Sequence, residues 1–400
     1  MKKTHILIGA SAAGIAAANK LRQLDALSTI IMISDELEAP YNKCMLADYM
    51  AGIKQESQVH TLTLAQAQQK NITLMLGSRV EQVLPEFKQI ALDDGTAMNY
   101  DTLLIATGTS PFVPAIDGLV GTQGVFTFHR LRDIQAIMAY IKNKPVKKVV
   151  VIGSGLSGLE CADALLPYNV QVSIIEMQGQ VLSSIINDEG AQFIQSHMAK
   201  QGVHFYPDQK VEQIMHHEGY VTGVKLASGQ LLEADMVIVA AGLKPNIELA
   251  KSAGIILGDY GIETNDYMQT SIADIYAAGD IALVKDQLTG TIVPSRMWPD
   301  AMLQGLVAAS SMAGHPRIYP GIASVISSSF FGIKFAACGP VLNPQGCQKI
   351  VNQGSDFYHL LLVKEDKLKG FLLVGNTGKC GILRQAVMTQ VPVTLEMLLP

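Results

Sequence analysis

The sequence predicts an α/β protein with two doubly wound parallel sheets, followed by a small α+β segment. Of the 400 residues, 48% are hydrophobic and 35 are glycine, which suits buried parallel strands joined by tight turns. A unit of strand, glycine turn, helix, strand and acidic residue occurs at 5–36 and recurs at 148–176. From about residue 319, short β-rich segments alternate with turns, which indicates a smaller domain. The chain is too long for one ordinary core, so we expect two or three domains.

Further elements are expected between and after the two units. Buried strands that end in turns are predicted at 100–108, 236–242 and 275–280. An amphipathic helix is predicted over 295–314, because apolar side chains recur there at spacings of three and four. Short strands in the C-terminal segment are predicted at 324–331, 357–364 and 369–374.

Composition and charge argue against several classes of protein. The net charge of −5 gives no sign of a nucleic-acid surface. No apolar run reaches the roughly 20 residues that cross a bilayer, and a strand, turn and helix explain residues 2–18 better than a signal peptide. Five cysteines are scattered without metal-ligand spacing, which favours a reducing compartment. We therefore expect a soluble, cytoplasmic protein with no metal site and with neither a nucleic-acid nor a membrane partner.

The first glycine turn reads GASAAG, from Gly9 to Gly14. Gly9 permits the tight turn and Gly14 permits close packing of helix on strand, while the helix N-terminus presents N–H groups to a pyrophosphate. Ser11 stands in the usual place of the middle glycine, where its small side chain still lets a phosphate approach. Asp35 and Glu36 follow the next strand, about 20 residues later, where a carboxylate can accept hydrogen bonds from ribose hydroxyls. Alone, this imperfect match could also be an ordinary turn beside a solvated acidic pair.

The second glycine turn reads GSGLSG, from Gly153 to Gly158, and is complete. The strand that follows its helix ends in Glu176, which again places an acid where it can bind a ribose. Two such motifs in the same context predict a dinucleotide site at the second turn. Glu160, inside the following helix, is either a solvated residue, a packing residue or a neighbour of the nicotinamide.

Other segments carry a resemblance to a known family. These segments are YDTLLIATG at 100–108, IYAAGD at 275–280, PYNKCML at 40–46, MWPDA at 297–301 and GNTG at 375–378. With the two glycine turns, they occur in the order found in the FAD-dependent pyridine nucleotide-disulfide oxidoreductases, which the chain resembles over essentially its whole length. Within that family it is most similar to the branch of rubredoxin and ferredoxin reductases and the large subunit of NADH-dependent nitrite reductase.

The resemblance implies binding roles for single residues. The ADP half of FAD would be held by Gly9, Ser11, Ala12, Gly14, Asp35 and Glu36, with Val80 meeting the adenine. The flavin would be lined by Lys43, Thr107, Gly108 and Asp280, and His129 stands where relatives carry an arginine at the flavin nucleotide. NADH would be bound by Gly153, Gly155, Leu156, Gly158, Glu160, Glu176 and Gly242. NADH is expected over NADPH, because Glu176 would repel a 2′-phosphate.

The resemblance also implies how the chain divides into domains. The FAD domain would comprise 1–117 and 247–322, and an NAD domain of 118–246 would be inserted in it. Residues 323–400 would form a C-terminal domain. In this family that domain often forms a subunit interface, so a homodimer is a possible assembly.

The expected activity is hydride transfer from NADH to FAD, followed by electron transfer to a small redox protein of rubredoxin or ferredoxin type. One alternative is a thiol, persulfide or disulfide reductase or an NADH oxidase that uses Cys44, beside Lys43, as the single redox cysteine. Another alternative is an NADH-sensing flavoprotein that acts through a binding partner. The structural explanation of Cys44 is a small residue that fills space. The family's paired redox cysteines are absent, so glutathione or lipoamide reductase activity is not expected.

Overall fold

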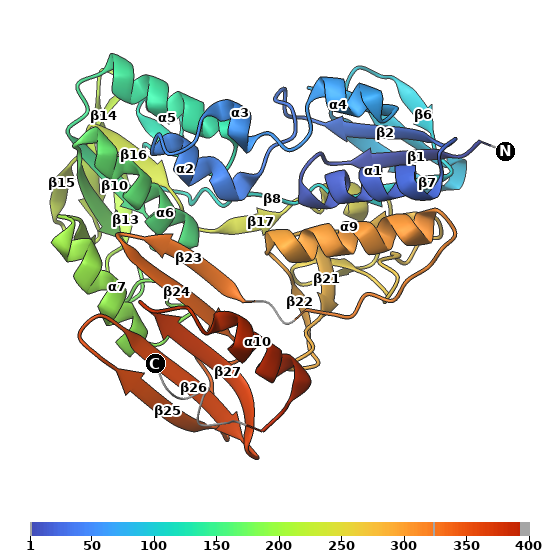
Figure 1. Cartoon of the computed structure of the whole chain (residues 1–400). Coiled ribbons are helices and arrows are strands. Elements are labelled where there is room, and N and C mark those ends of the chain that lie inside the picture. The colour runs from blue at the N-terminus through green and yellow to red at the C-terminus, as the bar shows by residue number, and fades with distance from the viewer. Residues whose placement is uncertain (1, 323–324, 393–400) are drawn as a thin grey trace. The chain divides into compact units, whose positions relative to one another are not determined.

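The computed structural model of the protein describes residues 2–322 and 325–392 and divides into two compact units (Figure 1). Unit 1 consists of Met1–Cys44, Gln55–Ser110 and Leu243–Ser324. Unit 2 consists of Met45–Lys54, Pro111–Gly242 and Val325–Pro400. Each unit contains one parallel sheet, so the predicted α/β fold class is confirmed.

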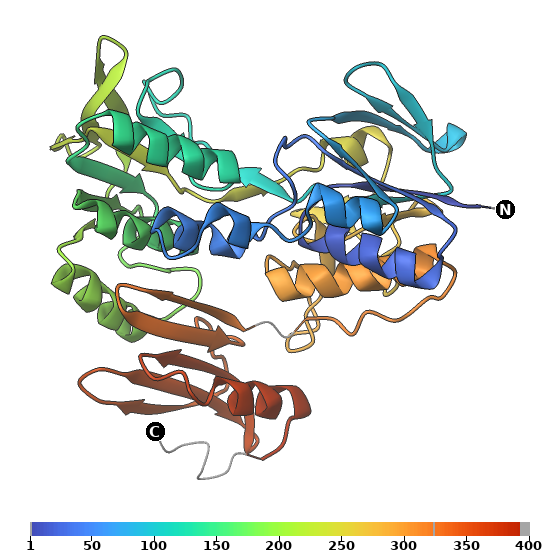
Figure 2. The ribbon, with the colours of Figure 1, turned by 45° about the horizontal axis from the view of Figure 1, so that its top comes forward.

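Unit 1 is built on a parallel sheet with the strand order β20-β7-β1-β2-β3. The strands are β1 (Thr4–Ile8), β2 (Thr29–Ser34), β3 (Ile72–Leu76), β7 (Thr102–Ile105) and β20 (Ile275–Ala277). Helices α1 (Ala12–Leu24) and α9 (Trp298–Met312) pack closely against each other and run side by side in Figure 2. Their close approach requires Gly305, because a Cβ there would lie 2.2 Å from the carbonyl oxygen of Ala13.

Smaller elements surround this sheet. The helices are α3 (Glu56–Val59), α4 (Leu64–Gln69) and α8 (Glu248–Ser252). One antiparallel sheet contains β4 (Val80–Leu84), β5 (Gln89–Leu92) and β6 (Ala97–Asn99). A mixed sheet contains β18 (Leu257–Gly258), β19 (Gly261–Glu263), β21 (Ala282–Lys285) and β22 (Ile292–Pro294), with β19 and β21 in parallel. A short pair, β8 (Thr109–Pro111) and β17 (Leu243–Pro245), lies where the chain changes units.

Unit 2 repeats the plan of unit 1 with a parallel sheet in the order β12-β11-β10-β16-β9. The strands are β9 (Val125–Thr127), β10 (Lys148–Ile152), β11 (Gln171–Ile175), β12 (His204–Tyr206) and β16 (Met236–Val239). The helices of this part are α5 (Leu131–Asn143), α6 (Leu156–Leu165) and α7 (Asp188–Lys200). A separate sheet contains β13 (Val211–His217), β14 (Tyr220–Leu226) and β15 (Leu231–Glu233).

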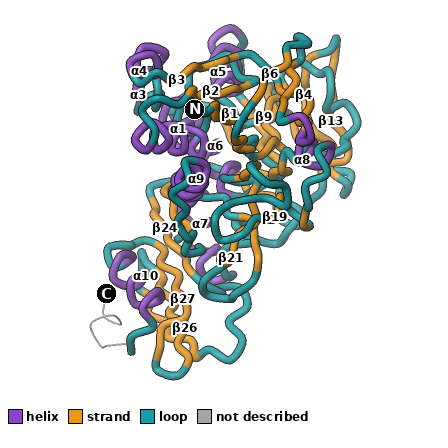
Figure 3. Tube along the Cα trace, turned by 90° about the vertical axis from the view of Figure 1, so that its right-hand side faces the viewer, coloured by secondary structure: helices purple, strands orange, loops and turns teal. Residues whose placement is uncertain are grey.

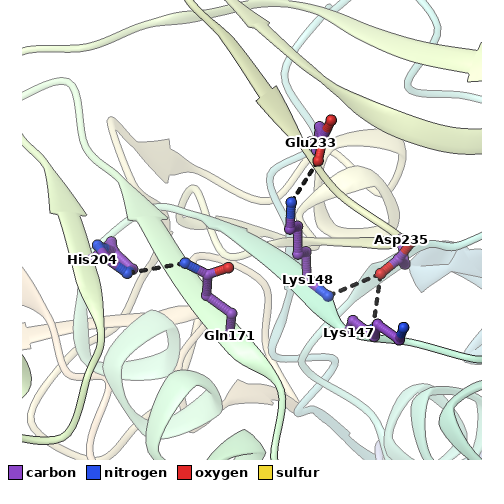
Figure 4. Close-up of polar contacts among 6 residues, drawn as sticks. All are labelled: Lys147, Lys148, Gln171, His204, Glu233 and Asp235. Carbon is purple, nitrogen blue, oxygen red and sulfur yellow. Dashed lines mark hydrogen bonds and ion pairs between the residues drawn. The ribbon is translucent and has the colours of Figure 1, made fainter.

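In both units an aspartate fixes the start of the strand that leads to the glycine turn. In unit 1 the backbone N–H of Thr4 donates to Asp101 (2.6 Å). In unit 2 the backbone N–H groups of Lys147 and Lys148 both donate to Asp235, at 2.8 and 2.9 Å (Figure 4). The aspartate in each case directly precedes the neighbouring strand, β7 or β16, so it sets the register of two parallel strands. The contacts of Asp235 in Figure 4 thus have a structural role at the amino end of the second sheet.

The C-terminal part of unit 2 is an antiparallel sheet in the order β23-β24-β27-β26-β25, with α10 (Cys380–Thr389) against β27 (Figure 3). The strands are β23 (Ile326–Phe330), β24 (Ile333–Cys338), β25 (Gln348–Gln353), β26 (Tyr358–Lys364) and β27 (Lys367–Val374). The predicted strands at 357–364 and 369–374 correspond to β26 and β27. Of the predicted strand at 324–331, Ser324 lies outside the described residues.

One short helix lies in a different unit from the residues that precede it. Helix α2 (Leu46–Met50) belongs to unit 2, where it contacts α5 and α6. The hydroxyl of Tyr168 donates to the carbonyl oxygen of Met50 (2.6 Å) and anchors this segment. The domain boundaries predicted from the sequence kept this segment with residues 1–117, and those boundaries stay a prediction. In the part of the chain that the structure describes, no helix is long and apolar enough to cross a membrane.

Candidate functional site

The first glycine turn is a crowded junction of β1, β7 and α1. Gly9 has φ +115°, and a Cβ there would lie 2.1 Å from the carbonyl oxygen of Ala106. A Cβ on Gly14 would lie 2.0 Å from the carbonyl oxygen of Gly9. Ser11 precedes α1 in an extended conformation, and its side chain makes no capping hydrogen bond to the described residues. The first N–H groups of this 13-residue helix therefore suit an anionic ligand.

The acids that follow β2 differ in their surroundings. Asp35 is exposed, whereas Glu36 is half-buried and accepts a hydrogen bond from the hydroxyl of Tyr41 (2.6 Å). Val80 is buried at the start of β4. One carboxylate oxygen of Glu38, a residue that the sequence analysis did not select, is buried without a partner among the described residues. The first unit thus has a half-buried acid after the end of β2 and, on Glu38, a buried acceptor that suits a donor from a ligand.

The turn after β7 is held by a residue that the sequence analysis missed. The side-chain amide of Asn246 donates to the carbonyl oxygen of Thr107 (2.8 Å), and the hydroxyl of Thr107 donates to the carbonyl oxygen of Asn246 (3.0 Å). The hydroxyl of Ser110 donates to the side chain of Asn246 (2.8 Å). Gly108 has φ +62°, and no described atom lies within 4 Å of the place of a Cβ. The turn therefore presents an open face that a planar ring can approach.

Asp280 ends the segment that follows β20, near two positive charges. Desolvation raises the pKa of Asp280, and the charges of Lys43 and Arg296 act in the opposite direction. The hydroxyl of Thr109 lies 3.5 Å from the carboxylate, which is a long hydrogen bond. The structure therefore brings together Lys43 and Asp280, which the sequence analysis selected, and adds Arg296, which it missed.

Gln304 of α9 supports the turn that carries Asp280. Its side-chain oxygen accepts a hydrogen bond from the backbone N–H of Gly279 (2.7 Å), and the side chain is fully buried. The nitrogen of the same amide has no partner among the described residues. A glutamine on the buried face of a predicted amphipathic helix is the signal that could have identified it, because buried polar side chains need a partner.

The second glycine turn repeats the packing of the first. Gly153 has φ +107°, and a Cβ there would lie 2.4 Å from the carbonyl oxygen of Ala240. A Cβ on Gly158 would lie 2.1 Å from the carbonyl oxygen of Gly153. Gly155 precedes α6, and no described atom lies within 4 Å of the place of its Cβ. Leu156 is the first residue of α6 and is half-buried.

The acid of the second unit, Glu176, contacts the glycine turn directly. Its carboxylate accepts hydrogen bonds from the backbone N–H and the hydroxyl of Ser154, at 2.9 and 2.8 Å. Gly242 follows β16 in the chain and has φ +122°. No described atom lies within 4 Å of the place of a Cβ on this residue. An open turn and an oriented carboxylate therefore lie at the carboxyl ends of β10, β11 and β16, where doubly wound sheets bind ligands.

Glu160 is a half-buried helix residue rather than a fully solvated one. The hydroxyl of Ser328 on β23 donates to its carboxyl group (2.7 Å). Burial raises the pKa of Glu160, and the negative charges of Asp48 and Asp163 raise it further. Asp163, one turn later on α6, accepts a hydrogen bond from the backbone N–H of Phe331 (2.8 Å). Two carboxyl groups of α6 therefore hold the hairpin of β23 and β24.

Cys44 and His129 lie in different units. Cys44 is exposed in the short 3-10 helix Lys43–Met45, where it is the last residue of a segment of unit 1, and its backbone N–H donates to the side chain of Asn42 (3.0 Å). His129 lies in unit 2, where its backbone N–H donates to Asp133 (3.1 Å) before α5 begins. Within the described ranges, no cluster of three or more His, Cys, Asp or Glu side chains could hold a metal ion.

The duplicated turns and their acids agree with comparison to known proteins. The family model described as pyridine nucleotide-disulphide oxidoreductase matches residues 3–305, which is more than half of the chain. The chain belongs to this family. It is therefore an oxidoreductase, and its cofactors are FAD and NADH.

Individual family members differ in the acceptors that their names state. The chain is 36% identical to an NADH oxidase of Methanocaldococcus jannaschii, over 80% of this chain and 73% of that one. It is 30% identical to a rubredoxin-NAD(+) reductase of Acinetobacter baylyi, over 93% of this chain and 94% of that one. The solved structure of an NAD-dependent persulfide reductase from A. fulgidus matches with a TM-score of 0.92 and 26% identity, and covers 97% of this chain and 77% of that one.

Proposed function

We propose that this family member accepts hydride from NADH on a bound FAD and passes the electrons to a small redox protein of rubredoxin or ferredoxin type. The observation that carries the proposal is the duplicated site: each unit has a glycine turn of the same geometry with an acid after the next strand. Bound flavin and nicotinamide supply the redox chemistry, so the protein has to bind, orient and shield them.

The residues proposed for FAD belong mainly to unit 1. The ADP half is assigned to Gly9, Ser11, Ala12, Gly14, Asp35, Glu36 and Val80, and the flavin half to Lys43, Thr107, Gly108 and Asp280. The open turn at Gly108 and the raised pKa of Asp280 support the flavin assignment, because a ribitol hydroxyl can donate to an otherwise poorly partnered carboxylate. Lys43 and Arg296 would keep the site positive. His129 retains its assignment near the flavin nucleotide as a proposal.

The residues proposed for NADH belong to unit 2. They are Gly153, Gly155, Leu156, Gly158, Glu160, Glu176 and Gly242. The N-terminus of α6 suits the pyrophosphate and Glu176 suits a ribose hydroxyl. In this assignment the FAD domain comprises 1–117 and 247–322, the NAD domain 118–246 and the C-terminal domain 323–400.

A protein acceptor is favoured by the extent of the similarity to the rubredoxin-NAD(+) reductase, which includes nearly all of both chains. The homodimer and the cytoplasmic location expected from the sequence are part of this proposal. They are tested by the mass of the purified protein in solution and by fractionation of the source cells.

A second candidate is a thiol or persulfide reductase in which Cys44 takes part. Cys44 is exposed and lies next to Lys43, a positive charge of the kind that favours a reactive thiolate. The structural similarity to a persulfide reductase supports the same candidate.

The test is rapid anaerobic mixing of the FAD-loaded protein with NADH, followed by candidate acceptors. We expect loss of the flavin absorption band on adding NADH, and its rapid return on adding oxidised rubredoxin or ferredoxin. The matched variant Cys44→Ser should transfer electrons to these proteins at the native rate. If the flavin band returns only with a persulfide, and only in the native protein, the second candidate replaces the first.

A further inference from the structure

The carboxylate of Glu176 accepts hydrogen bonds from three donors of its own chain. One oxygen accepts hydrogen bonds from both the backbone N–H and the hydroxyl of Ser154, and the other accepts one from the backbone N–H of Gln178 (2.9 Å). A carboxylate offers about four acceptor positions, and three are therefore filled. The remaining one lies on the oxygen that Gln178 contacts, so this is the atom left for a ligand.

Ser154 does not have the surroundings of a direct ligand residue. Its exposed fraction is 1%, and both its backbone N–H and its hydroxyl are directed to Glu176. In the first glycine turn the same position is Ala10, whose side chain has no hydroxyl, and Glu36 is instead contacted by Tyr41. A hydrogen bond from the side-chain hydroxyl of this position to the acid is therefore possible only in the second site.

We propose that Ser154 is a positioning residue that sets the preference for NADH over NADPH by keeping Glu176 in place. This inference rests on the proposed role of Glu176 at the adenosine ribose. A 2′-phosphate in that place meets the negative charge of Glu176, and the repulsion falls if the side chain turns away. Turning away breaks the hydrogen bonds from Ser154 and Gln178, so the fixed carboxylate continues to repel the phosphate. Rejection of the wrong ligand by a fixed charge is a recognised source of specificity.

The size of the effect follows from the hydroxyl bond alone, because the backbone donors remain in a Ser154→Ala variant. A hydrogen bond to a charged group typically contributes enough to change an equilibrium about tenfold. We therefore expect Ser154→Ala to lower the ratio of kcat/KM for NADH to that for NADPH by about tenfold. The change should appear mainly as a lower KM for NADPH, with kcat for NADH nearly unchanged, since Ser154 does not contact the nicotinamide in this assignment.

The experiment measures kcat and KM for both nucleotides with an artificial electron acceptor and the FAD-loaded protein. The variants are Ser154→Ala, Glu176→Ala and the double variant. Ser173→Ala is the matched control, because Ser173 lies on β11, the strand that leads to Glu176. We expect the double variant to show no greater loss of preference than Glu176→Ala alone, which a purely structural role of Ser154 would not produce. Thermal melting and FAD content establish that each variant is folded.

Different failures have different meanings. If Glu176→Ala loses the preference for NADH and Ser154→Ala keeps it, the inference about Ser154 is wrong and the role of Glu176 stands. If Glu176→Ala keeps the native preference, the ribose role of Glu176 in the proposed function is wrong, and the inference falls with it. An equal loss of preference in the Ser173→Ala control would also overturn the inference, because the effect would not be specific to Ser154.

Discussion

The two glycine turns have nearly the same backbone and different side-chain contacts. A Cβ would lie 2.1 Å from a carbonyl oxygen at Gly9 and 2.4 Å at Gly153, and the later glycines, Gly14 and Gly158, are equally close to the first ones. Ser11 is third in the first turn, whereas the second turn has Ser154 in second place and Ser157 in fifth. Ser154 contacts the acid of the second unit, whereas Glu36 in the first unit is contacted by Tyr41. In the proposed assignment the scaffold fixes where each dinucleotide lies, and one or two side chains decide how the ribose is recognised.

The largest expected effect comes from replacing the first glycine of each turn by alanine, in two separate variants. Gly9→Ala should abolish FAD uptake, and Gly153→Ala should abolish reduction by NADH while FAD is retained, if the two sites are as independent as their separate units suggest. Each substitution should lower the free energy of unfolding by about 3 kcal/mol, because the added Cβ overlaps a carbonyl oxygen and the residue has a positive φ. FAD content, NADH reduction and thermal melting are the measurements. Gly155→Ala, at an open position, should leave the melting temperature unchanged.

Asp280 belongs to the first site and has no counterpart that we identify in the second. Asp280→Ala should weaken FAD binding by about tenfold to a hundredfold, because a ligand donor loses its charged acceptor. Equilibrium titration of the apoprotein with FAD gives the change in Kd. Titration with NADH afterwards is the control, and a weaker NADH interaction at saturating FAD would contradict the separation of the two sites.

Gln304 tests whether α9 supports the first site through the backbone of Gly279. Gln304→Leu should weaken FAD binding by about tenfold, because a buried N–H loses its acceptor. Gln304→Glu keeps an oxygen in the same place and should retain more of the affinity. Equal Kd values for the two variants would show that the volume of the side chain matters, and not its hydrogen bond.

The smallest expected effect is a difference between the two parallel sheets in how stability depends on pH. His5, the second residue of β1, is fully buried, and desolvation lowers its pKa from the ordinary value of 6.5. The unfolded chain then binds more protons than the folded one, so stability falls as pH drops below about 6.5. The same position of β10 is Val149, which cannot titrate.

The matched variant is therefore His5→Val, which makes the first sheet resemble the second. It should remove the fall in stability that His5 causes as the pH drops below about 6.5, a slope of up to about 1.4 kcal/mol per pH unit. The measurement is urea unfolding at several pH values. Comparison of slopes, and not of absolute stability, is needed because the variant also leaves the hydroxyl of Thr102 without its contact to His5. An unchanged slope would exclude His5 as its source.

Sequence reasoning identified the parts of the candidate site that local chemistry determines, and their binding roles stay a prediction. The glycines are recognisable because positive φ and close packing require them, and Glu176 because it directly follows a buried strand. Asn246, Arg296 and Gln304 were missed, because each acts on a turn outside its own element, and Asn246 contacts Thr107 across 139 positions. The contact of Ser154 with Glu176 was also missed, since the pattern gives both residues without their orientation. Helix α2 is too short to indicate by its own pattern which unit it joins.

The hydrogen bonds from β23 and its turn to α6 also matter for protein engineering. Glu160 contacts Ser328, and Asp163 contacts Phe331. Residues 325–392 therefore cannot be exchanged with those of a relative independently of α6. A chimera that takes this segment from a relative without matching α6 would leave two carboxyl groups with lost partners, a defect that costs stability when the groups are buried. Exchange of the segment together with residues 156–165 keeps these two donors with their acceptors, and the bond from Asn187 to the hydroxyl of Tyr358 would still have to be matched. The boundary for recombination thus follows these contacts and not the order of the sequence.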